Sequence, residues 1–176
     1  ETEGYDAVAG ACFFDGAVRA AQQMMTIPVV GPAQVSMQLA ALLGTRFAAI
    51  TSDPRWIPEM EAHISEVGMR EHAIGYKPMR AITLAPDVFF GCLGGDYQPA
   101  VDNFAEIAEG CIDDGADVLI AGCGLLSPML TAAGLHQISG VPVLDPMLVS
   151  LKYAEMLVDY RQSGMPVKST AGLLLA

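Results

Sequence analysis

The stretch that decides the fold is Gly115-Ala-Asp-Val-Leu-Ile-Ala-Gly-Cys123, an apolar run that begins after a glycine and an aspartate and ends at a cysteine. Its four consecutive apolar residues at 118–121 are typical of a parallel strand that is buried on both faces. A similar stretch, Gly4-Tyr-Asp-Ala-Val-Ala-Gly-Ala-Cys12, has Gly, Asp and Cys at the same spacing. The sequence therefore predicts two strands that each end at a cysteine.

A second pair of similar segments follows the two cysteines. Ile27-Pro-Val-Val-Gly-Pro32 aligns with Val141-Pro-Val-Leu-Asp-Pro146, and each segment precedes a long amphipathic stretch. Chance is one explanation, because short apolar strands resemble one another. Two matches in the same order favour an internal duplication of a strand, cysteine, helix, strand and helix unit.

Apolar runs of strand length alternate with segments of helical period, which is typical of βαβ units and a parallel sheet. We expect strands at residues 7–10, 29–30, 47–51, 81–84, 118–121 and 143–144. We expect helices at residues 16–25, 33–43, 58–67, 99–114, 126–133 and 146–160. The predicted fold class is α/β.

The repeat also predicts the domain organisation: two pseudo-symmetric, flavodoxin-like half-domains with the active site in the cleft between them. Residues 1–45 form the first half, residues 46–145 the second, and residues 146–176 a C-terminal helix and tail that return to the first half. In the second half a strand and helix precede the cysteine, whereas only eleven residues precede Cys12. We therefore expect the first half to lack its opening strand and helix through truncation, or to be completed by a partner subunit.

Composition limits the class of protein and its partners. Hydrophobic residues make up 52% of the 176 residues and charged residues 16%, which indicates a folded globular protein. The net charge of -11 and the lack of any Lys or Arg run argue against nucleic acid or an anionic membrane as partner. No apolar stretch reaches the roughly 18 residues of a membrane span, and no signal-peptide pattern is present, so we expect a cytoplasmic location.

Four cysteines occur without CxxC or Cys/His clustering, which indicates reduced thiols and no metal site. Ligands of open parallel sheets bind at the carboxyl ends of strands, where Cys12 and Cys123 are expected to lie. Cys92 and Cys111 are interpreted as core residues. The other polar candidates are interpreted structurally: His63, His72 and His136 as surface or loop histidines, and Asp15 and Asp145 as helix-start carboxylates, although both aspartates lie at strand ends.

Two facing thiols can invert a carbon centre. One thiolate removes a proton from one face, and the opposite thiol returns a proton to the other face. Backbone N–H groups and a helix dipole beside the sulfur favour the thiolate. Gly122 and Gly124 leave room for a substrate and for free N–H groups that could bind an oxyanion. This chemistry needs neither a metal nor an organic cofactor.

At these residues the sequence resembles the aspartate/glutamate racemase superfamily, and within it the hydantoin racemase branch. The matching features, beside the two repeated pairs quoted above, are Leu42-Leu-Gly44 with Arg46-Phe, Gly140 before the second Val-Pro segment, and Lys152 with Ala154-Glu155. The resemblance implies a cofactor-independent racemase that uses Cys12 and Cys123 as acid/bases at the C5 carbon of 5-substituted hydantoins or allantoin. The amino-acid racemases of the superfamily have Cys-Thr-His at the second site, so Cys123-Gly-Leu here argues against aspartate or glutamate as substrate.

We expect six further residues to bind the substrate: Phe13, Thr51, Ser52, Gly122, Gly124 and Leu125. The resemblance implies that Thr51-Ser52 is the substrate-lining turn of the second half; a loop cap is the alternative. Arylmalonate decarboxylase keeps only the second cysteine, so two cysteines favour racemisation. A maleate isomerase-like enzyme and a non-catalytic ligand-binding domain remain alternatives. The expected partners are a small-molecule substrate and further copies of the chain in a homo-oligomer.

Overall fold

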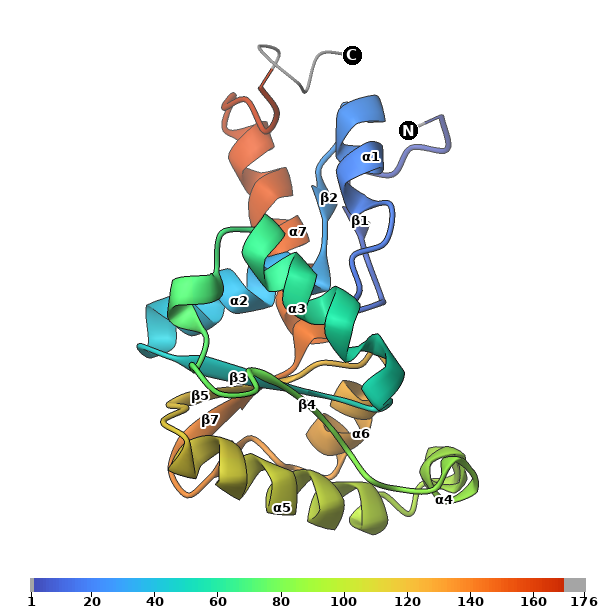
Figure 1. Cartoon of the computed structure of the whole chain (residues 1–176). Coiled ribbons are helices and arrows are strands. Elements are labelled where there is room, and N and C mark those ends of the chain that lie inside the picture. The colour runs from blue at the N-terminus through green and yellow to red at the C-terminus, as the bar shows by residue number, and fades with distance from the viewer. Residues whose placement is uncertain (1, 170–176) are drawn as a thin grey trace.

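A five-stranded sheet lies at the centre of the larger part of the computed structural model, which describes residues 2–169. The strands follow the order β4-β3-β5-β7-β6 (Figure 1). Their bounds are β3 Phe47–Thr51, β4 Met79–Ala81, β5 Val118–Ala121, β6 Gln137–Ile138 and β7 Val141–Leu144. The first four strands in this order are parallel, and β6 pairs antiparallel with β7. The predicted α/β class is confirmed.

The two middle strands, β3 and β5, are buried along their whole length because helices cover both faces of the sheet. Alternate residues face opposite ways. Ile50 and Leu119 pack toward α5 (Gln98–Asp113) and α6 (Leu126–Ala132). Phe47 and Ile120 pack toward α2 (Pro32–Leu43) and α3 (Ile57–Glu66). Figure 1 shows these two helical layers below and above the sheet.

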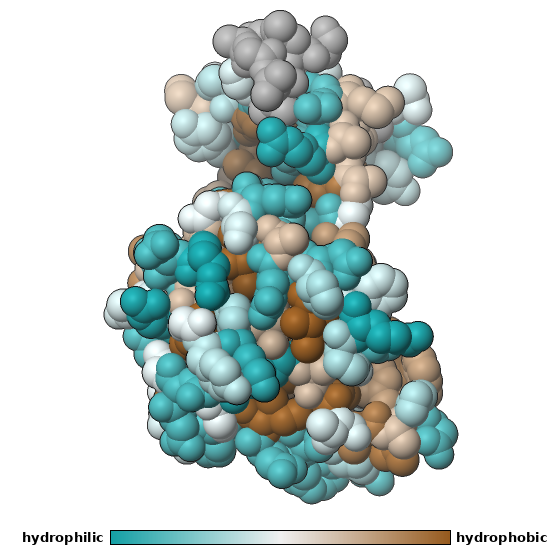
Figure 2. All heavy atoms as spheres, viewed as in Figure 1, coloured by the Kyte–Doolittle hydropathy of each residue, from teal (hydrophilic) through white to brown (hydrophobic). Residues whose placement is uncertain are grey.

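A smaller parallel pair, β1 (Val8–Ala9) and β2 (Val29–Val30), lies apart from the main sheet. Helix α1 (Val18–Met24) connects the two strands, and α7 (Pro146–Gln162) packs against β1, β2 and α2. In Figure 2 this part stands out from the larger body, and apolar residues are visible where the two parts join. The C-terminal helix therefore links the smaller sheet to the larger one.

The predicted elements agree with the structure to within one or two residues at most ends, with one clear error. The strand expected at residues 81–84 instead lies at β4, because the chain leaves the sheet after Ile82, whose N–H donates to the carbonyl of Thr51. Pro86 then starts the short helix α4 (Pro86–Gly91). The sequence also gave no signal for β6 or for the 3-10 turns Pro54–Trp56, Arg70–His72 and Cys92–Gly94.

Two other expectations concern the extent of the chain. Residues 170–176 of the predicted C-terminal tail lie outside the described residues. Within residues 2–169, none of the helices has the length and apolar character that a membrane crossing needs. The domain boundaries at residues 45 and 145 stay a prediction.

The loops that follow β1 and β5 touch each other at a glycine. A Cβ atom at Gly124 would overlap the carbonyl oxygen of Ala11, and a Cβ atom at Gly122 would lie 3.1 Å from the ring of Phe13. These two residues lack side chains because the loop after β1 occupies that space. The contact brings the segment around Cys12 against the end of β5.

We expect Gly124→Ala to destabilise the protein by about 1–3 kcal/mol, the usual cost of overpacking, because the carbonyl of Ala11 cannot move as freely as a side chain. Urea unfolding measures the change. The matched control is Gly91→Ala, since a Cβ atom there meets nothing within 4 Å. An equal loss of stability in both variants would show that the contact between the two loops has no such role.

Candidate active site

Cys12 and Cys123 border the same cavity, which has a volume of ≈ 370 Å³. The cavity lies where the chain leaves β1, β3 and β5. It is lined by Cys12, Phe13, Phe14, Thr51, Ser52, Trp56, Met60, Gly122, Cys123 and Gly124. Residues more than a hundred positions apart in the sequence thus meet around one space large enough for a small ring.

Cys123 is held between the end of β5 and the start of α6. Its N–H donates to the carbonyl of Ala121, and its own carbonyl accepts from the N–H of Ser127. The thiol is partly buried. Ser52, just after β3, donates its hydroxyl to the sulfur of Cys123 at 3.1 Å. A hydroxyl donor at this distance stabilises negative charge on the sulfur.

Cys12 lies on a turn after β1 and is exposed. Its carbonyl accepts a hydrogen bond from the N–H of Asp15 at 3.1 Å. The next residue, Phe13, is only 2% exposed and packs with Met60 and Ile64 of α3. The turn is therefore anchored by a buried ring while the Cys12 thiol stays at the cavity.

Asp15 ends this turn and is held from two sides. Its backbone has a φ of 50°, a left-handed conformation that aspartate tolerates better than most residues. Its buried carboxylate accepts from the N–H groups of Ala33 at 3.0 Å and Gln34 at 2.8 Å, so it caps α2 rather than the helix that follows it. Asp145 does cap its own helix, α7, by accepting from the N–H groups of Met147 and Leu148.

His63 lies on α3, is partly buried, and contacts Asp15, so its interpretation as a surface or loop histidine is wrong. Its Nε2 lies 3.3 Å from Oδ2 of Asp15, and its Nδ1 lies 3.4 Å from Oε2 of Glu66. The hydrogen bond to Asp15 raises the pKa of His63 above its ordinary value, against the opposing effect of burial. Sequence spacing gave no signal for this contact, which joins residues 48 positions apart. His72 and His136 are exposed, as predicted.

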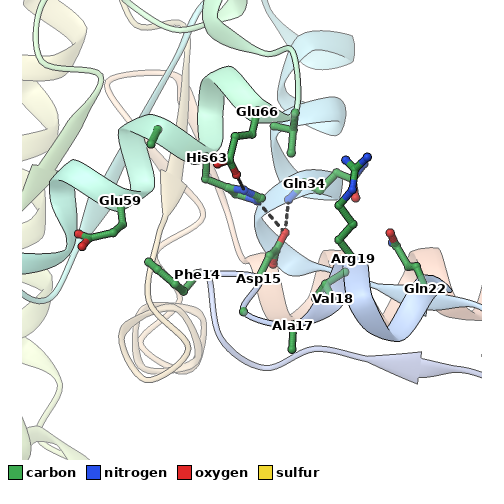
Figure 3. A pocket seen from close by; sticks show the side chains of 13 residues that line it. Phe14, Asp15, Ala17, Val18, Arg19, Gln22, Gln34, Glu59, His63 and Glu66 are labelled. Atoms are coloured by element: carbon green, nitrogen blue, oxygen red, sulfur yellow. Dashed lines mark hydrogen bonds and ion pairs between the residues drawn. The ribbon is translucent and has the colours of Figure 1, made fainter. Parts of the chain in front are cut away.

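Figure 3 shows the surroundings of His63 in a second cavity of ≈ 540 Å³. The ring points from α3 toward Asp15, and Arg19 and Gln34 approach from α1 and α2. Phe14 borders both cavities and therefore separates the His63 side from the side of the two cysteines.

Three residues of the cysteine cavity were not expected from the sequence: Phe14, Trp56 and Met60. The rings of Phe14 and Trp56 form an edge-to-face contact, with their centroids 6.0 Å apart. Only their closeness in sequence to predicted site residues could have indicated them, because Phe14 lies two residues after Cys12 and Trp56 follows the Thr51-Ser52 turn. Together they give the cavity an aromatic wall.

Two details of the predicted site differ in the structure. Leu125 does not line the cavity and is 45% exposed, because the chain enters α6 at the next residue. The N–H of Gly122 is not free for an oxyanion, since it donates to the carbonyl of Ile50 at 2.8 Å and so extends the strand pairing of β5 with β3. Phe13, Thr51, Ser52, Gly122 and Gly124 do line the cavity, and their roles remain a prediction.

The other two cysteines are buried away from this cavity. Cys92 donates its thiol to the carbonyl of Val88, and Cys111 packs in the core between α5 and the sheet. Burial raises the pKa of Cys111 to about 11, which keeps it a neutral thiol. All four cysteines are free of disulfides. Within residues 2–169, no three His, Cys, Asp or Glu side chains are grouped so that they could hold a metal ion.

Residues 1–154 match the protein family described as Asp/Glu/Hydantoin racemase. A hydantoin racemase of Rhizobium meliloti is 33% identical over 159 residues, which are 90% of this chain and 62% of that protein. A hydantoin racemase of Pseudomonas sp. (strain NS671) is 29% identical over 173 residues, which are 96% of this chain and 65% of that protein.

Among solved structures, allantoin racemase from Klebsiella pneumoniae is similar, with a TM-score of 0.80 and 25% sequence identity. The similarity covers 98% of this chain and 66% of that one. This chain therefore spans just under two thirds of the length of the relatives that it matches.

We expect Ser52→Ala to slow alkylation of Cys123 by iodoacetamide by about 2- to 10-fold, as the loss of one hydrogen bond of about 0.5–1.5 kcal/mol implies. Peptide mass spectrometry after timed quenching measures Cys123 and Cys12 separately. The alkylation rate at Cys12 serves as the internal reference. The matched control is Ser163→Ala, because Ser163 lies at the C-terminal end of α7 and does not line the cavity. Unchanged alkylation of Cys123 in Ser52→Ala would rule out this influence of the hydroxyl.

Proposed function

Because this chain belongs to the Asp/Glu/Hydantoin racemase family, we propose that it forms the catalytic part of a racemase of 5-substituted hydantoins or allantoin. One observation carries the proposal: Cys12 and Cys123, which follow different sheets, line one cavity. The names of the relatives support the substrate class. The chemistry needs no cofactor.

The proposed reaction moves one proton off C5 and returns one to the opposite face. The thiolate of one cysteine takes the C5 proton, and the electron pair delocalises onto the adjacent ring carbonyl as an enolate. The thiol of the other cysteine then protonates C5 from the other side, which leaves the first cysteine as thiol and the second as thiolate. The reverse direction exchanges their roles, so no atom is gained or lost.

The surroundings of the two sulfurs suit this exchange. Ser52 donates a hydrogen bond to the sulfur of Cys123, which holds this thiol beside the end of β3. Phe13, Phe14, Trp56 and Met60 supply apolar walls that reduce the access of water and strengthen electrostatic interactions within the cavity. Cys123 is followed by Gly124 and Leu125, where the amino-acid racemases of the superfamily have Thr-His, and this difference supports a ring substrate that lacks a free ammonium and carboxylate.

The proposal includes two pseudo-symmetric halves, divided near residues 45 and 145. Strand β1 leads to Cys12 and β5 leads to Cys123, and each pairs in parallel with a later strand, β2 or β7. Each later strand enters a helix that begins at a proline, Pro32 or Pro146. This shared order supports a duplication. A homo-oligomeric state and a cytoplasmic location also stay predictions.

We expect the protein to exchange the C5 proton of either enantiomer of 5-benzylhydantoin with solvent deuterium and to abolish its optical rotation. Cys12→Ser and Cys123→Ser should each lower these rates by about 10²- to 10⁴-fold, the usual contribution of a positioned acid or base. NMR of the C5 position and polarimetry measure the two processes, with the uncatalysed rate subtracted.

Cys92→Ala is the matched control, because its thiol lies in the core outside the cavity. Full activity in Cys12→Ser and in Cys123→Ser would contradict the two-cysteine mechanism. Ligand binding without exchange by the unmodified chain would instead favour a non-catalytic ligand-binding domain.

The aromatic wall predicts a preference for apolar 5-substituents over the polar ureido group of allantoin. Trp56 is the single tryptophan of the chain, so its fluorescence should change when 5-benzylhydantoin binds.

We expect Trp56→Ser to lower kcat/KM for 5-benzylhydantoin by about 2- to 10-fold, as the loss of an aromatic contact of about 0.5–1.5 kcal/mol implies. The value for allantoin should change less, and Tyr76→Ser, an exposed aromatic outside the cavity, is the control. Equal losses for both substrates would contradict this role of Trp56.

A further inference from the structure

Besides the buried ring of Phe13, the side chain of Asp15 fastens the turn that carries Cys12 to the rest of the protein. The N–H of Asp15 binds the carbonyl of Cys12, and its carboxylate binds the first N–H groups of α2. The same carboxylate contacts His63 of α3. A displacement of His63 can therefore move Cys12, because Asp15 lies only three residues after Cys12 in the chain.

The ring of His63 faces a carboxylate oxygen at each nitrogen, Asp15 on one side and Glu66 on the other. A neutral imidazole has one N–H, whereas an imidazolium has two. Only the protonated ring can donate to both carboxylates at once. The geometry itself thus selects the charged form of His63.

Two further charged groups line the pocket that His63 borders. Arg19 of α1 and Glu59 of α3 line the same pocket as Asp15, Glu66 and His63 (Figure 3). Only two of these groups, the carboxylates of Asp15 and Glu66, lie within hydrogen-bond distance of the imidazole, and both favour the cation. The raised pKa of His63 agrees with this arrangement.

Helix α3 also forms part of the cysteine cavity. Met60, one helical turn before His63, lines that cavity, and Trp56 lies directly before the helix. The contact between His63 and Asp15 consequently connects the wall formed by α3 with the turn formed by residues 12–15. The separation of these two parts determines where Cys12 lies relative to a bound ring.

We propose that His63 is a positioning residue for Cys12, and that the proton on its ring ties the turn of residues 12–15 to α3. For its effect on turnover the inference rests on the proposed racemase function; the structural link does not. The link is fully present at pH values below about 6.5, the ordinary pKa of histidine. Because the folded protein favours the protonated ring, the link weakens as the pH rises through the raised pKa of His63, where the neutral ring keeps a single N–H for its two carboxylates.

The structural link is tested by two-dimensional NMR of the uniformly labelled full chain between pH 5 and pH 9. We expect the amide signals of Phe13 to Gly16 to shift with the same midpoint as the ring protons of His63. In His63→Gln, which keeps a donor but cannot titrate, this common step should disappear. His72→Gln, a change of an exposed histidine, should retain it. Turn amides that do not follow His63 in the unmodified protein would overturn the inference.

The effect on catalysis is tested with 5-benzylhydantoin. His63→Leu should lower kcat by roughly 10- to 100-fold, since small displacements of a reacting group have effects of this size. KM should change little because the substrate contacts remain. His63→Gln should recover part of the loss. The kcat of the wild-type protein divided by the kcat of His63→Gln should fall as the pH rises through the titration of His63. A pH-independent ratio would overturn the inference.

The two measurements separate the inference from the proposed function. Coupled NMR titration in a protein that racemises neither 5-benzylhydantoin nor allantoin would support the link between His63 and the turn and would reject the racemase. Racemisation without coupled titration would support the racemase and reject the link. Thermal melts of His63→Leu and His63→Gln show whether each variant is folded. If only His63→Gln is folded, that variant alone is enough to test the pH dependence of the link.

Discussion

The close approach of the Ala11 carbonyl to Gly124 is the constraint on which the rest of the site depends. The strand ends of two separate sheets can share a cavity only if their following loops touch. A side chain at Gly124 would force these loops apart and widen the space between the two cysteines. The buried ring of Phe13 lies against Gly122 and forms a second contact between the same two loops. Backbone packing between the loops therefore sets the geometry in which the thiols can act.

The helices that follow β2 and β7 start in related ways that differ in chemical detail. Asp145 caps α7 with its own carboxylate and is held by the hydroxyls of Ser127 and Thr131. The matching position before α2 is Gly31, and a Cβ atom there would lie 2.5 Å from the carboxylate of Asp15. Asp15 thus supplies the missing cap from the cysteine turn. Because this cap comes from the turn itself, the position of Cys12 is coupled to α2 and, through His63, to α3.

The environments of the two thiols are consequently unequal. Cys123 is partly buried and receives a hydroxyl donor, whereas Cys12 is exposed and depends on the contacts of its turn. The proposed proton transfer runs in both directions, so each sulfur would have to act both as acid and as base. The aromatic pair of Phe14 and Trp56 lines the cavity that both cysteines border.

Local pattern was enough to determine the α/β class, most helix bounds and the placement of Cys12 and Cys123 after strands, because buried strands and helix starts leave periodic and residue-specific signals. The glycines beside Cys123 and the family resemblance also pointed to Gly122, Gly124, Thr51 and Ser52, which line the cavity. Only the tertiary structure decided that Trp56 lines that cavity, that Leu125 does not, that the Gly122 N–H is already paired, and that His63 meets Asp15. These features depend on which atoms meet across long sequence separations, and such contacts leave no periodicity in the chain itself.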